Sequence, residues 1–97
     1  MLVTNTPNFL HIVIKRDGRR EPFDISKLQN SIRAALKMSG AKHNPVDGEL
    51  ARESLNVIKT KTSQKEIRTS DIREIVQEIF YSNGYNDTAQ SYIFYRY

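Results

Sequence analysis

Residues 13–27 read VIKRDGRREPFDISK, and this stretch predicts two strands joined by a tight turn and then the start of a helix. The residues before the turn, 9–16, are rich in β-branched side chains, which favour a strand. Asp17-Gly18 is the dipeptide that best tolerates the positive φ angles of a two-residue type I′ turn. Residues 19–23 would return as the second strand, where Pro22 is tolerated at a position that needs no ladder N–H. We therefore expect this part of the chain to form a β-hairpin.

Two helices are expected next, one ending near Gly40 and one over about residues 47–59. Asp24 and Ser26 can both cap the first helix, and glycine is a natural terminator. Apolar residues recur at helical spacing in the first helix and less regularly in the second. The residues expected to face inward are Ile25, Leu28, Ile32, Ala35 and Leu36 in the first helix and Leu50, Ala51, Leu55 and Ile58 in the second.

A polar loop is expected over residues 61–68, and the clearest helical pattern of the chain follows it. This third helix opens at Thr69-Ser70-Asp71 and ends at Gly84. A last helical segment starts at Asp87 or Thr88. The residues expected on the inner side are Ile72, Ile75, Val76, Ile79 and Phe80 in the third helix and Ala89, Tyr92, Ile93 and Arg96 in the last segment.

These elements predict a fold of the α+β class that is mainly α, with an N-terminal β-hairpin packed on a bundle of about four helices. Residues 1–8 show no periodicity and are expected to be a flexible N-terminal arm, so that residues 9–97 form a single domain. A chain of 97 residues is long enough for one modest core. No apolar run approaches the ~20 residues that a membrane-spanning helix needs, and no signal peptide is visible. We therefore expect a cytoplasmic location and no membrane partner.

The net charge of +4 is placed unevenly along the chain. Residues 1–46 carry eight Lys and Arg against three Asp and Glu, whereas residues 47–97 carry seven against eight. The first half can therefore attract a polyanion, and this charge alone is compatible with a nucleotide, a nucleic acid or an anionic membrane. Cysteine is absent from the chain, which excludes disulfides, zinc ribbons and thiol chemistry within it.

Basic residues surround the predicted turn and the start of the helix that follows. A nucleoside triphosphate needs converging cations, and the first turn of a helix adds free N–H groups and a favourable dipole. Glu21 and Asp24 are acceptors suited to a purine amino group or to holding a basic side chain. The basic residues are Lys15 and Arg16 before the turn, Arg19 and Arg20 after it, and Lys27 in the helix. On spacing alone, a solvated hairpin tip and helix start explains the same charges, and Arg19 and Arg20 are expected to point to solvent.

Three motifs occur in order: V-x-K-R-D-G-x-x-E-x-F-D-x-x-K from Val13, I-x-T-x-x-I from Ile67 and A-x-x-Y-I-x-Y-R from Ala89. Together they resemble the ATP-cone family over residues 12–97. Members of that family form the N-terminal allosteric domain of many ribonucleotide reductases, and they follow a zinc ribbon in the bacterial repressor of ribonucleotide reductase genes. The resemblance implies a non-catalytic regulatory domain that binds ATP or dATP as an allosteric ligand, with Mg²⁺ bound through the phosphates.

The resemblance also implies a role for individual residues of the site. The assigned nucleotide-binding residues are Val13 and Phe23 in the adenine pocket, Glu21 and Asp24 at the adenine edge, and Lys15, Arg16 and Lys27 at the phosphates. Thr69 would be both a helix cap and a wall of the pocket. Arg73, one turn further on, would face the ribose, although some reductases carry His there and the chain departs from that pattern. Val13 and Phe23 are expected to be core residues in either case.

Other functions compete with this interpretation. A pI near 9.5 and a short helical domain also fit a nucleic-acid-binding or transcription-regulatory module. The exposed face of the helix over residues 71–78 mixes acidic and basic side chains, which disfavours a continuous track for phosphates. The chain has no P-loop motif and no paired catalytic carboxylates, and His11 and His43 have no acidic partner at ligand spacing, so neither catalysis nor a metal site is expected. Besides the nucleotide, the expected partner is a second copy of the chain, or a reductase or regulator protein.

Overall fold

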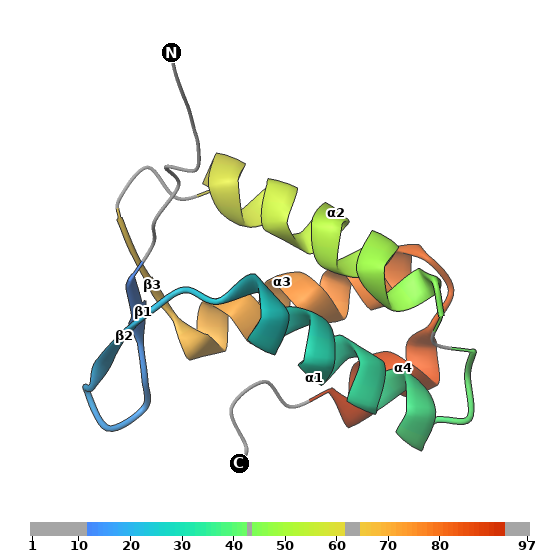
Figure 1. The fold of residues 1–97 in the computed structure, drawn as a ribbon. Coiled ribbons are helices and arrows are strands. Elements are labelled where there is room, and N and C mark those ends of the chain that lie inside the picture. Colours follow the sequence, from blue (N-terminus) through green and yellow to red (C-terminus); the bar gives the residue numbers. More distant parts are fainter. Residues whose placement is uncertain (1–11, 43, 62–64, 93–97) are drawn as a thin grey trace.

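A computed structural model describes residues 12–42, 44–61 and 65–92 (Figure 1). The elements in chain order are β1 (Ile12–Ile14), β2 (Arg20–Pro22), α1 (Ile25–Met38), α2 (Val46–Lys61), β3 (Glu66–Arg68), α3 (Thr69–Ser82) and α4 (Asn86–Ser91). The predicted fold class, mainly α with an N-terminal hairpin on a helical bundle, is confirmed. The expected N-terminal arm over residues 1–8 lies outside the described residues.

The strands form one small sheet at one end of the helices, in the order β2-β1-β3 (Figure 1). Strand β1 pairs antiparallel with β2, with Val13 opposite Glu21, and parallel with β3, with Val13 opposite Ile67. Val13 and Ile67 are both buried, so the face of the sheet that carries them packs against the helical core. The prediction of a polar loop over residues 61–68 was therefore wrong for residues 66–68, which form β3. Strand β3 is too short to show a period of two, and its pairing with β1 makes it a strand.

The turn of the hairpin differs from the predicted two-residue type. Ile14 pairs with Arg20, and the backbone N–H of Lys15 donates to the carbonyl of Arg19 at 2.8 Å, which leaves residues 16–18 as the loop. The N–H of Gly18 donates to the carbonyl of Lys15 at 2.9 Å, and Gly18 has a φ of 90°. This is a three-residue hairpin loop, in which a turn is followed by a glycine in the left-handed region. The dipeptide Asp17-Gly18 predicted the position of the turn correctly, but the register of the two strands decides the length of the loop.

Helix α1 begins as predicted, because Oδ1 of Asp24 accepts a hydrogen bond from the backbone N–H of Ser26 at 2.9 Å. Gly40, with a φ of 79°, follows the end of this helix. Ile25 was expected to face inward, but it is 41% exposed. As the first residue of α1 it lies at the end of the helix, where it lines a surface hollow rather than the core.

The core includes apolar side chains from the sheet and from all the helices named above. Phe80 and Tyr92 pack edge to face with ring centroids 5.8 Å apart. Tyr92 follows the end of α4 in an extended conformation and is buried, whereas Ile93 and Arg96 lie outside the described residues. The buried apolar residues of the described part are Val13, Leu28, Ile32, Ala35, Leu36, Leu50, Ala51, Ile58, Ile67, Ile72, Ile75, Val76, Ile79, Phe80, Ala89 and Tyr92, and Leu55 is half-buried.

A partly buried ion pair joins α1 to the start of α2. Nε of Arg33 donates to Oδ2 of Asp47 at 2.7 Å, and the Asp47 side chain is almost completely buried. Burial alone would raise the pKa of Asp47. Hydrogen bonds from Arg33, from the backbone N–H of Gly48 and from the side chain of Gln29 outweigh this effect and hold the pKa below its ordinary value.

We expect Asp47→Asn to lower the free energy of unfolding by about 1–2 kcal/mol at pH 7, because it weakens hydrogen bonds made to a charged group. A carboxyl whose pKa is lowered by folding stabilises the protein above its unfolded pKa of about 3.9, and this stabilisation is lost as the pH falls through the folded value. The difference between wild type and variant in urea unfolding should therefore be larger at pH 7 than at pH 3. Asp71→Asn, at an exposed position in the first turn of α3, is the control. An equal difference at both pH values would contradict this account.

Two buried serines on neighbouring helices should respond oppositely to the same substitution. In α1, Oγ of Ser31 lies 2.7 Å from the carbonyl of Leu28 and 3.0 Å from the buried hydroxyl of Tyr92. In α2, Oγ of Ser54 is buried and has no hydrogen-bond partner among the described residues. We expect Ser31→Ala to cost about 1 kcal/mol and Ser54→Ala to be neutral or stabilising by up to about 1 kcal/mol. Thermal unfolding measures both, and an equal loss in the two variants would contradict the prediction.

Candidate nucleotide-binding site

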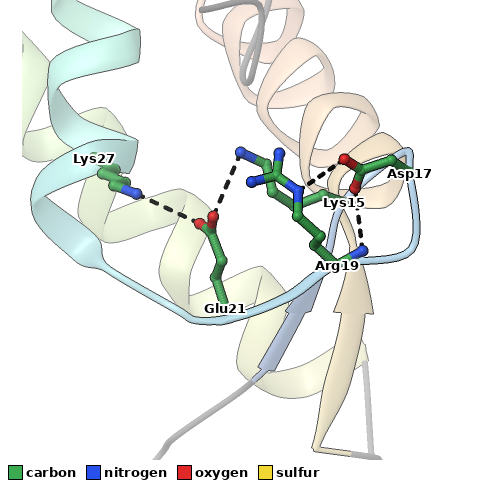
Figure 2. A network of polar contacts seen from close by, with 5 residues as sticks. All are labelled: Lys15, Asp17, Arg19, Glu21 and Lys27. Carbon is green, nitrogen blue, oxygen red and sulfur yellow. Dashed lines mark hydrogen bonds and ion pairs between the residues drawn. The ribbon is translucent and has the colours of Figure 1, made fainter.

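A carboxylate shared by two lysines forms the centre of the site (Figure 2). Oε2 of Glu21 lies 3.7 Å from Nζ of Lys15, and Oε1 of Glu21 lies 3.5 Å from Nζ of Lys27. The side chains of Lys15, Glu21 and Lys27 are 16%, 27% and 54% exposed. The network therefore extends from the hairpin, across the end of β2, to the first turn of α1.

The strand register explains why these side chains meet. Residues directly opposite each other in an antiparallel pair, and residues two apart along a strand, lie on the same face of a sheet. Glu21 is opposite Val13, and Lys15 is two residues beyond Val13, so both belong to the inner face. Lys27 reaches Glu21 from the start of α1, which follows β2 closely in the chain.

A surface hollow of about 440 Å³ lies beside this network. Its volume is within the range of small-molecule sites. Phe23 is half-buried against the core and gives the hollow part of its apolar wall, while Asp24 caps α1. The residues that line the hollow are Glu21, Pro22, Phe23, Asp24, Ile25 and Lys27. Four of the nine predicted site residues therefore share one concave surface.

The remaining predicted residues are placed differently. Val13 is completely buried in the core, as expected from its position in the sheet. Arg16 is exposed in the hairpin loop and forms no ion pair with any residue of the described ranges. Thr69 is half-buried, and Arg73 is exposed one turn later on α3. No ion pair within the described part of the chain connects Arg73 to the Lys15–Glu21–Lys27 network.

The prediction that Thr69 caps α3 was wrong by one residue. The cap position belongs to Arg68, whose side chain makes no capping hydrogen bond. Arg68 pairs with Ile14 in the sheet, and this pairing keeps its backbone extended, so the helix begins at Thr69. The sheet therefore leads into α3 without an intervening residue.

Two ion pairs near the site were not anticipated. In the hairpin loop, Asp17 accepts hydrogen bonds from the backbone N–H of Arg19 at 3.1 Å and from Nε of Arg19 at 2.7 Å. These hydrogen bonds, the backbone one first, hold the pKa of Asp17 below its ordinary value. On the other face of the sheet, Arg20 pairs with Glu66 from β3. The spacing of Asp17 and Arg19 within a turn was the available signal for the first pair, whereas the second depends on the unpredicted strand β3.

A family model of the ATP cone domain matches residues 11–97. The chain belongs to the ATP-cone family. Three relatives illustrate where this cone has counterparts. The chain is 35% identical over 71 residues to the transcriptional repressor NrdR of Treponema denticola, and this match covers 73% of the chain and 47% of the relative. It is 40% identical over 65 residues to NrdR of Thermomicrobium roseum, covering 67% of this chain and 39% of the relative.

The third relative is the anaerobic ribonucleoside-triphosphate reductase of Haemophilus influenzae, which is 33% identical over 84 residues. The match covers 87% of this chain and 12% of the reductase. The chain therefore spans less than half the length of each of these relatives. As a member of the family, the chain is a regulatory, nucleotide-sensing domain.

Membrane-spanning helices and metal-binding clusters are both absent from the described part of the ATP cone. None of its helices is both long and apolar enough to cross a membrane. Its Asp and Glu side chains form no group of three that could hold a metal ion. His11 and His43 lie outside the described residues.

The role of the Glu21 carboxylate can be tested with an inorganic anion that has no nucleobase. Glu21→Gln keeps the size of the side chain but removes the negative charge that pairs with both ammonium groups. Inorganic tripolyphosphate should then bind about fivefold more tightly than to the wild type, because a like charge close to the anion is removed. Calorimetric titration measures this change. Glu66→Gln on the opposite face of the sheet should have little effect, and an unchanged affinity in Glu21→Gln would contradict the expectation.

Proposed function

We propose that this ATP cone binds ATP or dATP at the hollow beside β2 and reports the nucleotide to the rest of a longer protein or to a partner. The observation that carries the proposal is the pair of ammonium groups, from Lys15 and Lys27, that share the single carboxylate of Glu21. Two cations balanced by one anion leave a local excess of positive charge beside a cavity of suitable size. This arrangement suits a ligand that carries several negative charges and a planar group.

The phosphates would replace Glu21 as the partner of the two lysines. Charge-assisted hydrogen bonds from ammonium groups to phosphate oxygens are stronger than neutral ones, and a triphosphate offers more acceptors than one carboxylate. Arg16 in the exposed loop would add a further contact from the hairpin. Mg²⁺ would bind through the phosphates, because it keeps most of its water ligands and takes the rest from phosphate oxygens.

The base would occupy the hollow next to Phe23. Once the lysines bind phosphate, the carboxylate of Glu21 is released to accept a hydrogen bond from the adenine amino group. The second oxygen of Asp24 would serve the same edge, since its Oδ1 caps α1. Thr69 and Arg73 at the start of α3 would close the site from the ribose side, so Arg73→Ala should affect ATP and dATP unequally.

The relatives suggest what the sensor controls. Two of those described above are named transcriptional repressors and one is named a ribonucleotide reductase. We therefore propose that the cone regulates ribonucleotide reduction, either within a reductase or through the expression of its genes, and does not itself catalyse a reaction. The nucleotide would act by changing the surface offered to a second copy of the chain or to the regulated protein. A ligand shifts such an equilibrium only by its difference in affinity for the two states.

Calorimetric titration with ATP, dATP and GTP in Mg²⁺ buffer tests the proposal. We expect adenine nucleotides to bind and GTP to bind less tightly, because its base has a carbonyl where adenine has its amino group. Lys15→Ala and Lys27→Ala should each cost about 1.5–3 kcal/mol of binding free energy. Lys37→Ala, in the last turn of the same helix as Lys27, is the matched control and should leave affinity unchanged. Equal affinity for ATP and GTP, or unchanged affinity in Lys15→Ala, would contradict the proposed site.

A further inference from the structure

We infer that Arg19 is a further phosphate-binding residue of this site and that Asp17 positions it. This inference rests on the proposed nucleotide function and adds a residue that sequence analysis expected to point to solvent. It assigns to Arg19 the phosphate farthest from the base. Its grounds are the strand register, the hydrogen bonds of the hairpin loop and the contrast with Arg20.

Register places Arg19 on the same face as the lysine and carboxylate of the site. The backbone N–H of Lys15 donates to the carbonyl of Arg19 at 2.8 Å, so the two residues are directly opposite each other where the hairpin loop begins. Opposite residues share a face of the sheet, and so do residues 19 and 21 along the returning strand. Figure 2 shows the side chains of Lys15, Arg19 and Glu21 on one side of the hairpin.

Asp17 holds the guanidinium of Arg19 in this position. Its two oxygens accept from the backbone N–H and from Nε of the same residue, at 3.1 and 2.7 Å. Within the described part of the chain, the Arg19 side chain donates a hydrogen bond through Nε, so both terminal amino groups are left for a ligand. An arginine held in place before binding loses less side-chain freedom when the ligand arrives.

The spacing of side chains along the returning strand indicates which phosphate Arg19 would bind. Residues 19, 21 and 23 alternate with residues on the opposite face and are separated by about 6.6 Å per step. Phe23 lines the hollow proposed for the base, Glu21 joins the two lysines, and Arg19 lies at the hairpin end of this row. Arg19 is also much more exposed than Lys15, at 64% against 16%. A nucleotide that extends from the hollow toward the hairpin would bring its terminal phosphate to Arg19, whose planar guanidinium can bind two phosphate oxygens at once.

Arg20 provides an internal comparison. It is the next residue in the chain, carries the same charge and has a similar exposure of 57%. It pairs with Glu66 across the outer face of the sheet, away from Glu21 and the lysines. An effect of net charge alone would be the same at both arginines, whereas a contact with the ligand is expected only at Arg19.

The test is calorimetric titration of the 97-residue chain and its variants with ATP, ADP and AMP in Mg²⁺ buffer. Arg19→Gln should weaken ATP binding about tenfold, weaken ADP binding less and leave AMP binding unchanged, because only the terminal phosphate is lost from contact. Arg20→Gln should change ATP affinity less than twofold. Circular dichroism and thermal unfolding of each variant show whether the hairpin substitution has disturbed the fold, and Arg19→Lys should restore part of the affinity.

Asp17→Asn tests the positioning role. It should weaken ATP binding about threefold and leave AMP binding unchanged, and the double variant Asp17→Asn/Arg19→Gln should bind no more weakly than Arg19→Gln alone, because Asp17 acts through Arg19. Additive losses in the double variant would overturn the role of Asp17. Equal losses in Arg19→Gln and Arg20→Gln, with wild-type binding intact, would overturn the inference about Arg19 alone. Failure of the wild type to bind any adenine nucleotide would instead overturn the proposed function, and this inference with it.

Discussion

Strand β1 is hydrogen-bonded on both of its edges, and the arrangement of the site depends on this pairing. On one edge it pairs with β2, which is its neighbour in the chain, and on the other with β3, which follows two helices later. Val13 in the middle of β1 is completely buried, so the sheet is anchored to the helical core at its centre. The pairing with β2 brings Lys15 and Glu21 together, and the pairing with β3 brings the start of α3 to the same end of the molecule. A change that breaks either pairing would therefore separate the proposed adenine and phosphate groups from the proposed ribose contacts.

Each of the charged groups that we assign to phosphate binding, Arg16 apart, already has a partner in the folded chain. Glu21 balances Lys15 and Lys27, and Asp17 holds Arg19. Such pairs contribute little to stability at the surface because water and salt screen them. They do keep several cations close together, which would otherwise repel one another. In our proposal, nucleotide binding is therefore an exchange of partners, in which phosphate oxygens take over from a carboxylate.

Sequence patterns predicted the elements that depend on neighbouring residues, and failed where distant residues decide the structure. The hairpin, the Asp24 cap and the inner faces of α1, Ile25 apart, and of α3 follow from local signals and are confirmed. Strand β3 has one buried side chain, Ile67, and becomes a strand by pairing with residues more than fifty positions earlier. For the same reason the sequence did not reveal the Arg20–Glu66 pair or the cap of α3 at Arg68, one residue before the expected cap. The Lys15–Glu21–Lys27 network could be predicted from the sequence because all three residues lie in the hairpin or directly after it.

The direct junction between β3 and α3 limits how this domain can move. Arg68 is the last residue of the strand and Thr69 the first of the helix, so no flexible residue separates them. A slip of one residue in the strand would turn Ile67 out of the core and would rotate the helix by about 100°, and both changes oppose the packing of α3. We therefore expect β3 and the start of α3 to move together. In our proposal, a nucleotide that displaces the strands would therefore displace α3 with them, and the exposed side of this helix would carry the signal away from the site.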